Sequence, residues 1–253
     1  MAGGLIEGFQ KVFKGKNLIQ KHLFLFLLSI ALLSINILKN SHTLTMGLLI
    51  PISLVSNIIL YLYILHFTHN AVKFCVYSDR EENIEKVKAI QIMPEVNLNI
   101  FSHFWSWLGF IIIWWLIFFS LGLVIGFLAS LPILGLLFVF IAYIFSFIIV
   151  FSYPIIITKF AETYSVKHNL SVANLFLYFP KVFVPVFLLY LKVLLILVPI
   201  FFILKIIYTM CDNFLILFII KLITLYILII TWLAISYEYA NIYYNKIKIE
   251  EEI

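Results

Sequence analysis

Long apolar runs separated by short polar segments make up most of the chain. A helix needs about 20 apolar residues to cross the ~30 Å hydrocarbon core of a bilayer. Runs of about this length occur six times, and each predicts a membrane-spanning helix: about 22–38, 46–67, 105–129, 132–157, 182–204 and 214–237. The pattern therefore predicts an all-α, polytopic membrane protein with six transmembrane helices.

The stretch between residues 96 and 158 contains no Asp, Glu, Lys or Arg. Because a helix rises ~1.5 Å per residue, this stretch is far too long for one crossing and must turn back. A Ser-Leu-Pro sequence at 130–132 provides the turn. Extending this pairing to the other spans predicts three helical hairpins. Their tight turns lie on one side of the membrane, and the longer connections 69–99 and 158–181 lie on the other.

Residues 1–21 combine apolar positions at helical spacing with several lysines. The apolar positions recur at intervals of three and four: Leu5, Ile6, Phe9, Val12 and Phe13. This pattern predicts an amphipathic helix that lies in the membrane interface and contacts anionic lipids. A solvated N-terminal tail is the alternative. The single membrane domain then covers 22–240, and a cytoplasmic tail covers 241–253.

The composition limits the class of protein to which the chain can belong. Hydrophobic residues make up 64% of the chain and charged residues 11%, against about 25% charged residues in soluble domains. A soluble globule of this length could not cover so much apolar surface. The net charge is +5, but the basic residues flank apolar runs, so no nucleic-acid partner is expected. The lipid bilayer is the expected environment.

The distribution of Lys and Arg predicts the orientation. The N-terminus, the two long connections and the tail together hold thirteen of these residues, whereas the tight turns hold two, Lys39 and Lys205. Short loops on the cytoplasmic side carry an excess of basic residues. We therefore expect both termini in the cytoplasm, with the domain in a cytoplasmic (inner) membrane.

Two lysines lie inside predicted spans, where a charge is costly and often functional. Lys192 is predicted near the midplane and Lys221 closer to the outer surface. Together with Asn57, they are the candidate ligand-binding residues, for an anionic or amphiphilic solute. Snorkelling of the ammonium to the headgroups is the alternative for both lysines. The expected neighbours of Lys192 are Ser53, Ser56, Asn57 and Tyr226.

Three glycines predict close helix packing: Gly122 and Gly126 at GxxxG spacing in the third span, and Gly135 after the turn. A dimer face at these glycines is the alternative, so the oligomeric state stays open.

His66 and His69 could in principle bind a metal with Cys75, but no third firm ligand follows, so no metal site and no cofactor are expected. Nucleotide-binding and hydrolase motifs are also absent from the sequence, and no paired carboxylates lie within the spans. We therefore do not expect an enzyme.

Four features resemble an uncharacterised family of bacterial and archaeal polytopic membrane proteins, labelled domain of unknown function 4013. They are the basic amphipathic start from Phe9 to Lys16, Met93-Pro94-Glu95, Gly109, and Phe160-Ala161-Glu162. The chain departs from the family at Asn70-Ala71, where Gly-Tyr is expected, and at Val96, where an acid is expected. The resemblance implies six helices and no known activity.

Two functional hypotheses follow. In the first, the protein is a non-enzymatic membrane component that acts in assembly, in envelope organisation or as a partner of other proteins. In the second, it is a small transporter or permease that uses Lys192. A polar cavity that reaches the midplane would favour transport, whereas a Lys192 side chain that faces outward would favour the first hypothesis.

Overall fold

The computed structural model describes residues 4–37, 43–78, 87, 90–131, 135–169, 171–211 and 213–249. Within these ranges the chain is almost entirely helical and contains no β-strand. The long helices are α2 (Leu18–Ile37), α3 (Thr43–Ser78), α5 (Phe104–Ala129), α6 (Gly135–Thr163), α7 (Ala173–Met210) and α8 (Phe214–Tyr243). The predicted all-α class is therefore confirmed.

Five helical segments are long and apolar enough to cross a membrane: Ile50–Ser78, Leu98–Ala129, Gly135–Thr163, Ala173–Met210 and Phe214–Lys248. They contain the last five of the predicted spans, apart from a few residues at their ends. The first predicted span falls in α2. The apolar stretch described there, Leu18–Leu33, is shorter than the other five. Long apolar helices are the elements with which an α-helical integral membrane protein crosses the bilayer.

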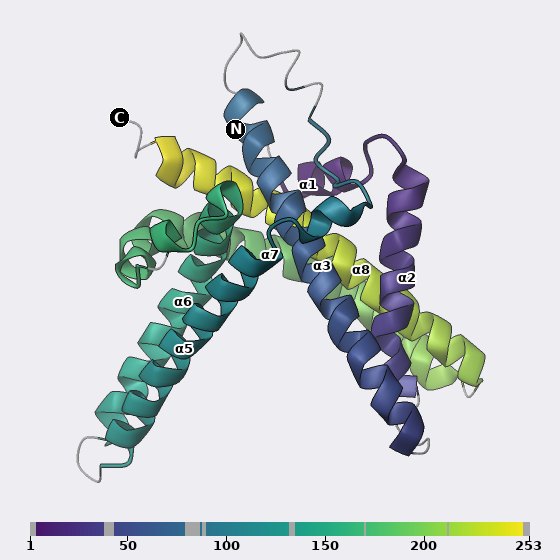
Figure 1. Ribbon diagram of the computed structural model, residues 1–253. Helices are drawn as coiled ribbons and strands as arrows, with labels where there is room; N and C mark the ends of the chain where they lie inside the picture. The colour runs from purple at the N-terminus through teal and green to yellow at the C-terminus, as the bar shows by residue number, and fades with distance from the viewer. Residues whose placement is uncertain are drawn as a thin grey trace.

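The long helices form two legs that diverge from a common end (Figure 1). The first leg consists of α5 and α6, and the second consists of α2, α3 and α8. Helix α7 connects the legs, because it packs on both α6 and α8. At its start, the Phe179 and Phe183 rings pack on the Phe147 ring of α6, at centroid distances of 5.9 and 5.6 Å.

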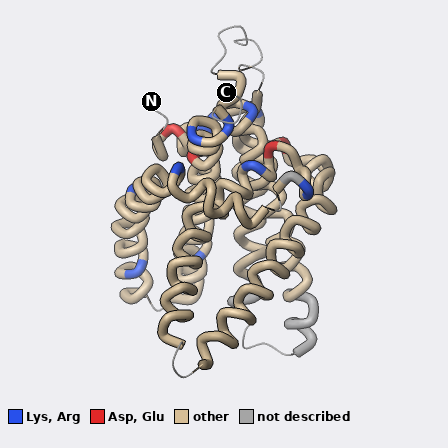
Figure 2. Tube along the Cα trace, turned by 90° about the vertical axis from the view of Figure 1, so that its left-hand side faces the viewer, with Lys and Arg blue, Asp and Glu red and all other residues tan. Residues whose placement is uncertain are grey.

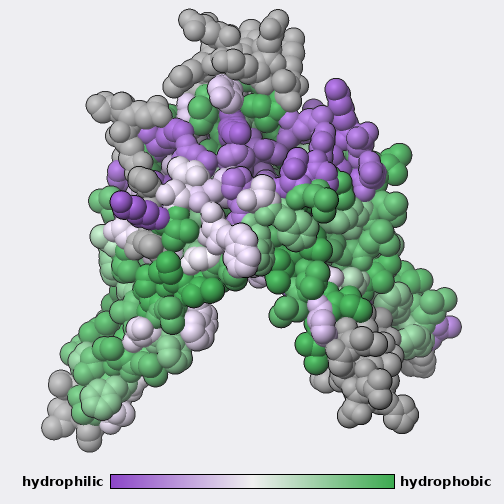
Figure 3. Space-filling view, in the orientation of Figure 1, coloured by the Kyte–Doolittle hydropathy of each residue, from purple (hydrophilic) through white to green (hydrophobic). Residues whose placement is uncertain are grey.

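Charged residues gather at the end where the two legs meet (Figure 2). Below that end, both legs present an apolar surface (Figure 3). The protein core also lies at the junction, where Tyr63, Phe67, Phe160, Leu233 and Tyr237 are buried. This distribution matches a protein whose legs are immersed in lipid and whose polar end lies at the membrane surface.

The N-terminal helix α1 (Leu5–Val12) is shorter than the amphipathic segment expected over residues 1–21. The backbone turns at Gly15 and Asn17, which have positive φ angles of 137° and 55°, and α2 then begins. Helix α1 packs on α8 with Leu5, Gly8 and Val12 buried, whereas Ile6 and Phe13 are exposed. Much of the predicted apolar face therefore contacts protein instead of lipid.

The three glycines expected at close helix contacts differ in their surroundings. A Cβ atom added to Gly135 would lie 2.4 Å from the Ala129 carbonyl oxygen at the end of α5, so only glycine fits at the α5–α6 turn. A Cβ at Gly122 or Gly126 would meet nothing within 4 Å. Within the described part of the chain no other helix packs against Gly122 or Gly126, so close packing at these two glycines stays a prediction.

Helix α8 has a defined start that also sets the α7–α8 turn. The Asn213 side chain accepts hydrogen bonds from the backbone N–H groups of Leu215 and Ile216, at 2.9 and 3.4 Å. An asparagine at this position satisfies N–H groups that lack a partner within the helix. The cap fixes where the chain turns back beside the end of α7.

Candidate functional site

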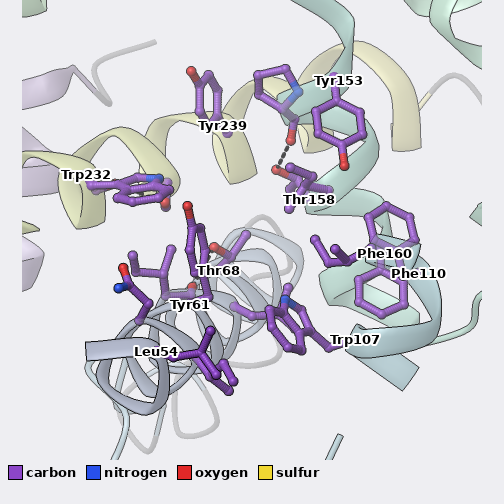
Figure 4. Close-up of a pocket in the computed structure, with 18 residues that line it drawn as sticks. Leu54, Tyr61, Thr68, Trp107, Phe110, Tyr153, Thr158, Phe160, Trp232 and Tyr239 are labelled. Atoms are coloured by element: carbon purple, nitrogen blue, oxygen red, sulfur yellow. Dashed lines mark hydrogen bonds between the residues drawn. The ribbon is translucent and has the colours of Figure 1, made fainter. Parts of the chain in front are cut away.

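A cavity of about 650 Å³ lies between the two legs, below the polar end. Its walls come from α3, α5, α6 and α8, and Figure 4 shows their side chains around a common space. The lining residues are mostly apolar or aromatic, and include Tyr61, Trp107, Phe110, Tyr153 and Trp232. A volume of this size falls within the range of known ligand pockets, about 300–1,000 Å³.

The threonine and serine hydroxyl groups in the cavity wall hydrogen-bond to their own helices. Each donates to the carbonyl four residues earlier, at 2.8 to 2.9 Å: Thr68 to Ile64, Thr158 to Pro154, and Ser236 to Trp232. A hydroxyl that donates to its own backbone offers no proton to a ligand. Among the described residues no charged side chain lines the cavity, so the wall is uncharged and mostly apolar.

Two tryptophans and an asparagine lie around Tyr61 on α3 in the cavity wall. The Tyr61 ring meets Trp232 of α8 edge-on, with centroids 5.2 Å apart, and Trp107 of α5 at 6.5 Å. One helical turn away, Asn57 donates to the carbonyl oxygen of Ser53 at 2.8 Å. Tyrosine and tryptophan combine an apolar ring with one polar group, which suits the boundary between a lipid tail and its headgroup.

The cavity is elongated along α3. Its lining residues on that helix run from Leu54 to Thr68, a length of ~21 Å at ~1.5 Å per residue. This exceeds half of the ~30 Å hydrocarbon core. The cavity therefore matches an extended chain better than a compact solute.

A second cavity of about 610 Å³ lies near the α7–α8 turn, between α2, α7 and α8. Lys221 lines this cavity together with Lys205 and Tyr208. The Lys221 ammonium lies 5.7 Å from the centroid of the Tyr208 ring. Lys221 is thus far along α8 from Trp232, which lines the first cavity.

Lys192 is exposed on α7 and lines neither cavity. Of its expected neighbours, Tyr226 instead pairs with His22, with 2.6 Å between the hydroxyl oxygen and ring Nδ1. Ser56 donates to Ile52 of its own helix at 2.7 Å. The predicted site of Lys192, Asn57 and Lys221 is therefore not formed, because the three residues lie in different parts of the structure.

The sequence pattern did not single out one buried acidic residue, Glu238 of α8. Burial desolvates its carboxyl group, and the charges of Glu7 and Lys192 also act on it. The carboxyl oxygen Oε1 has no hydrogen-bond partner in the described part of the chain. Glu238 directly follows the predicted last span, and α8 continues past it to Tyr243. An acid immediately after an apolar run was the available signal.

The histidines at the polar end hold the connections between helices. His66 Nε2 lies 3.1 Å from the Ile100 carbonyl, and His69 Nδ1 lies 2.7 Å from the Ala161 carbonyl. His103 stacks on Tyr164 with ring centroids 3.7 Å apart. Burial raises the pKa of the Tyr164 hydroxyl above its usual value. In the ranges described, no three His, Cys, Asp or Glu side chains group around a possible metal ion.

Lys21 contributes to the packing at this end, in addition to its positive charge, which the sequence offers as a signal of orientation. Its side chain is 2% exposed, and its ammonium donates to the Met93 carbonyl at 2.8 Å and to Gln91 Oε1 at 3.1 Å. Asn70 donates to the Gln91 carbonyl at 3.1 Å. The Met93-Pro94-Glu95 motif thus belongs to a segment that is bound to the start of α2 and to α3.

No family model matches the chain, and neither a curated protein nor a solved structure is significantly similar to it. The resemblance to domain of unknown function 4013 therefore stays a prediction.

Proposed function

We propose that the protein is a non-enzymatic, multi-pass membrane component that binds the apolar chain of a lipid in the cavity between its legs. The observation that supports this is the uncharged, mostly apolar cavity of about 650 Å³, whose serine and threonine hydroxyl groups donate to their own helices. A binding role of this kind fits a part in envelope organisation or in the assembly of a membrane complex.

The chemistry of the wall selects the ligand. A charged solute would lose its hydration in this cavity and find no opposite charge among the described lining residues, which is strongly unfavourable. An apolar chain loses no hydrogen bonds there and gains close contacts with aromatic rings. The headgroup of such a lipid would lie near Tyr61, beside the Trp107 and Trp232 rings.

The transporter hypothesis depends on Lys192, and the geometry gives it less support. The Lys192 side chain is exposed on α7 and lines neither cavity. A transport site for an anionic solute requires the cation to face the path of that solute. The proposed lipid-binding role needs no such charge.

The proposed topology has six crossings in three hairpins, with α2 as the first crossing and both termini in the cytoplasm. Support comes from the packing of α2 on α3, α5 on α6 and α7 on α8, and from the excess of Lys and Arg on one side. The polar end would then face the cytoplasm (Figure 2).

Reporter fusions test this topology. A reporter that is active only outside the cytoplasm is expected to give signal when fused after Asn40, Ser130 or Asn213. Fusions after Asn83 and Asn245 are expected to be silent, because both positions lie on the side rich in Lys and Arg. Signal after Asn83 would reverse the proposed orientation of every later helix.

A bulky substitution in the cavity wall tests the lipid-binding role. Ile111 of α5 lines the cavity, and the Ile111→Trp variant is expected to lower saturable labelling by a photoactivatable fatty acid at least about tenfold, because the indole fills the space that the chain needs. Labelling is measured on the purified protein, and mass spectrometry maps the adducts to peptides that contain Tyr61 and Trp232.

The matched control is Ile112→Trp. Ile112 is the next residue of the same helix and is exposed, but it does not line the cavity. This variant is expected to label as the wild type does. Equal loss in both variants, or adducts spread evenly over both legs without saturation, would argue for general contact with lipid instead of a binding site.

A further inference from the structure

The second cavity combines two lysines with an apolar wall. Lys205 of α7 and Lys221 of α8 both line it, together with Tyr208. Lys205 lies five residues before the end of α7 and Lys221 seven residues after the start of α8, or about 8 and 11 Å along each helix. When the α7–α8 turn is at the membrane surface, both backbone positions lie near the boundary of the hydrocarbon core, from which a lysine side chain reaches the headgroups.

This pair of lysines has no acidic counterpart among the residues that the structure places in the cavity wall. Two like charges that share one cavity repel each other. The Tyr208 ring face, 5.7 Å from the Lys221 ammonium, offsets this only in part. An anion between the lysines would remove the repulsion. Asp212, in the α7–α8 connection, lies outside the described residues.

The rest of the wall is suited to acyl chains. It is formed by Leu33 of α2, Phe201 and Leu204 of α7, and Ile220, Leu225 and Leu228 of α8. A free phosphate ion would leave this apolar surface uncovered, whereas a phospholipid covers it with its tails and places its phosphate near the lysines. Charge and apolar surface therefore favour the same ligand class.

We propose that this cavity binds an anionic phospholipid, with the phosphate between Lys205 and Lys221 and an acyl chain along Leu204 and Leu225. The α7–α8 turn, beside which this site lies, is away from the end where charged residues gather (Figure 1, Figure 2). The site is separate from the cavity between the legs, so its test does not depend on the proposed function.

Binding is tested on the full-length protein in a neutral detergent. Dioleoyl phosphatidylglycerol and dioleoyl phosphatidylcholine are titrated, and the stoichiometry and affinity are read by native mass spectrometry. The wild type is expected to bind one molecule of phosphatidylglycerol. Its affinity for this lipid is expected to be higher than its affinity for phosphatidylcholine. The double variant Lys205→Gln/Lys221→Gln is expected to bind it about 30-fold more weakly, because two lysines lose their attraction to the anionic lipid.

Two variants distinguish a specific binding site from general attraction of the anionic lipid to positive charge. Lys192→Gln removes an exposed lysine of the same helix that lines neither cavity, and it is expected to bind like the wild type. Lys205→Arg/Lys221→Arg keeps both charges and is expected to retain tight binding. Because both lysines are exposed, none of these variants is expected to unfold, and the melting temperature in phosphatidylcholine checks this.

Several outcomes would overturn the proposal. One is unchanged phosphatidylglycerol affinity in the double glutamine variant, and another is an equal loss in Lys192→Gln. A third is competition by inorganic phosphate as effective as by the lipid, which would assign the lysines to a free anion. As a second measurement, a photoactivatable phosphatidylglycerol must label peptides that contain Phe201 or Leu225, and labelling elsewhere alone would also refute the site.

Discussion

Replacement of Gly8 by leucine is expected to detach α1 from α8 and to lower the melting temperature of the protein. A Cβ atom added at Gly8 would lie 2.6 Å from the Ala234 carbonyl oxygen and 3.2 Å from the Ala234 Cα. Both are backbone atoms of α8 and cannot rotate away as a side chain can. Even Gly8→Ala is therefore expected to destabilise the protein by about 1–3 kcal/mol.

Detachment of α1 would also remove the contacts that this helix makes with the polar end. The Tyr237 hydroxyl donates to the Glu7 carboxylate at 2.7 Å, and the Lys11 ammonium lies 3.9 Å from the centroid of the Phe74 ring. Leu5 and Val12 would lose their burial. The loss is measured by thermal unfolding in detergent and by the rate of tryptic cleavage after Lys11, which should rise when α1 is free.

The control for Gly8 is Gly4→Leu, because a Cβ at Gly4 would meet nothing within 4 Å. This variant is expected to melt and to be cleaved like the wild type. A Gly8→Leu protein with an unchanged melting temperature and unchanged cleavage would mean that α1 does not pack on α8 in the membrane protein.

The positions of the apolar helices were predictable because hydropathy is summed over whole segments. The third predicted span, 105–129, differs by one residue from α5, Phe104–Ala129. The helix boundaries near polar residues were harder to predict. Helix α3 continues to Ser78, well past residue 67, where the predicted membrane span ends. Polar residues such as His69, Asn70 and Lys73 end an apolar run, but their helix propensities still permit a helix.

The partner of an apolar face was not predictable in the same way. Lipid and protein interior are equally apolar, so a hydropathy pattern does not tell which of them a face contacts. The lysines and apolar positions of α1 predicted an interfacial helix, yet Gly8 is the residue that reveals contact with protein. The same ambiguity explains the glycines of α5, since small residues permit close packing but do not supply a partner.

The candidate sites depend on residues that are distant in sequence. Tyr61, Trp107 and Trp232 each appear in the sequence as ordinary aromatic residues of apolar helices. Only the arrangement of α3, α5 and α8 brings them to one cavity. Lys192 was singled out because a charge in an apolar run is conspicuous. The position of such a charge in the sequence indicates its depth in the membrane, but not the side of the helix on which it lies. Lys221 was noticed for the same reason, whereas its pairing with Lys205 required the structure.

The second large effect is expected from Lys21→Met. Methionine is similar in length to lysine and apolar, so it fills the same buried volume but donates no hydrogen bond. The Met93 carbonyl and the Gln91 side chain would both lose the Lys21 ammonium, their partner at 2.8 and 3.1 Å. A buried acceptor left without its partner costs about 1–3 kcal/mol, so the melting temperature should fall clearly.

The effect should concentrate in the segment that Lys21 holds. Asn70 and Tyr63 also bind this segment, through the Gln91 and Pro94 carbonyls at 3.1 and 3.4 Å. Amide hydrogen exchange over residues 91–97 is therefore expected to increase in Lys21→Met more than exchange in α5. Lys16→Met is the control, because Lys16 is an exposed lysine of the same N-terminal cluster. If both variants behave alike, Lys21 contributes only its charge. If only Lys21→Met loosens residues 91–97, the lysine that the sequence presents as an orientation signal is also the residue that fixes the Met93-Pro94 segment to α2.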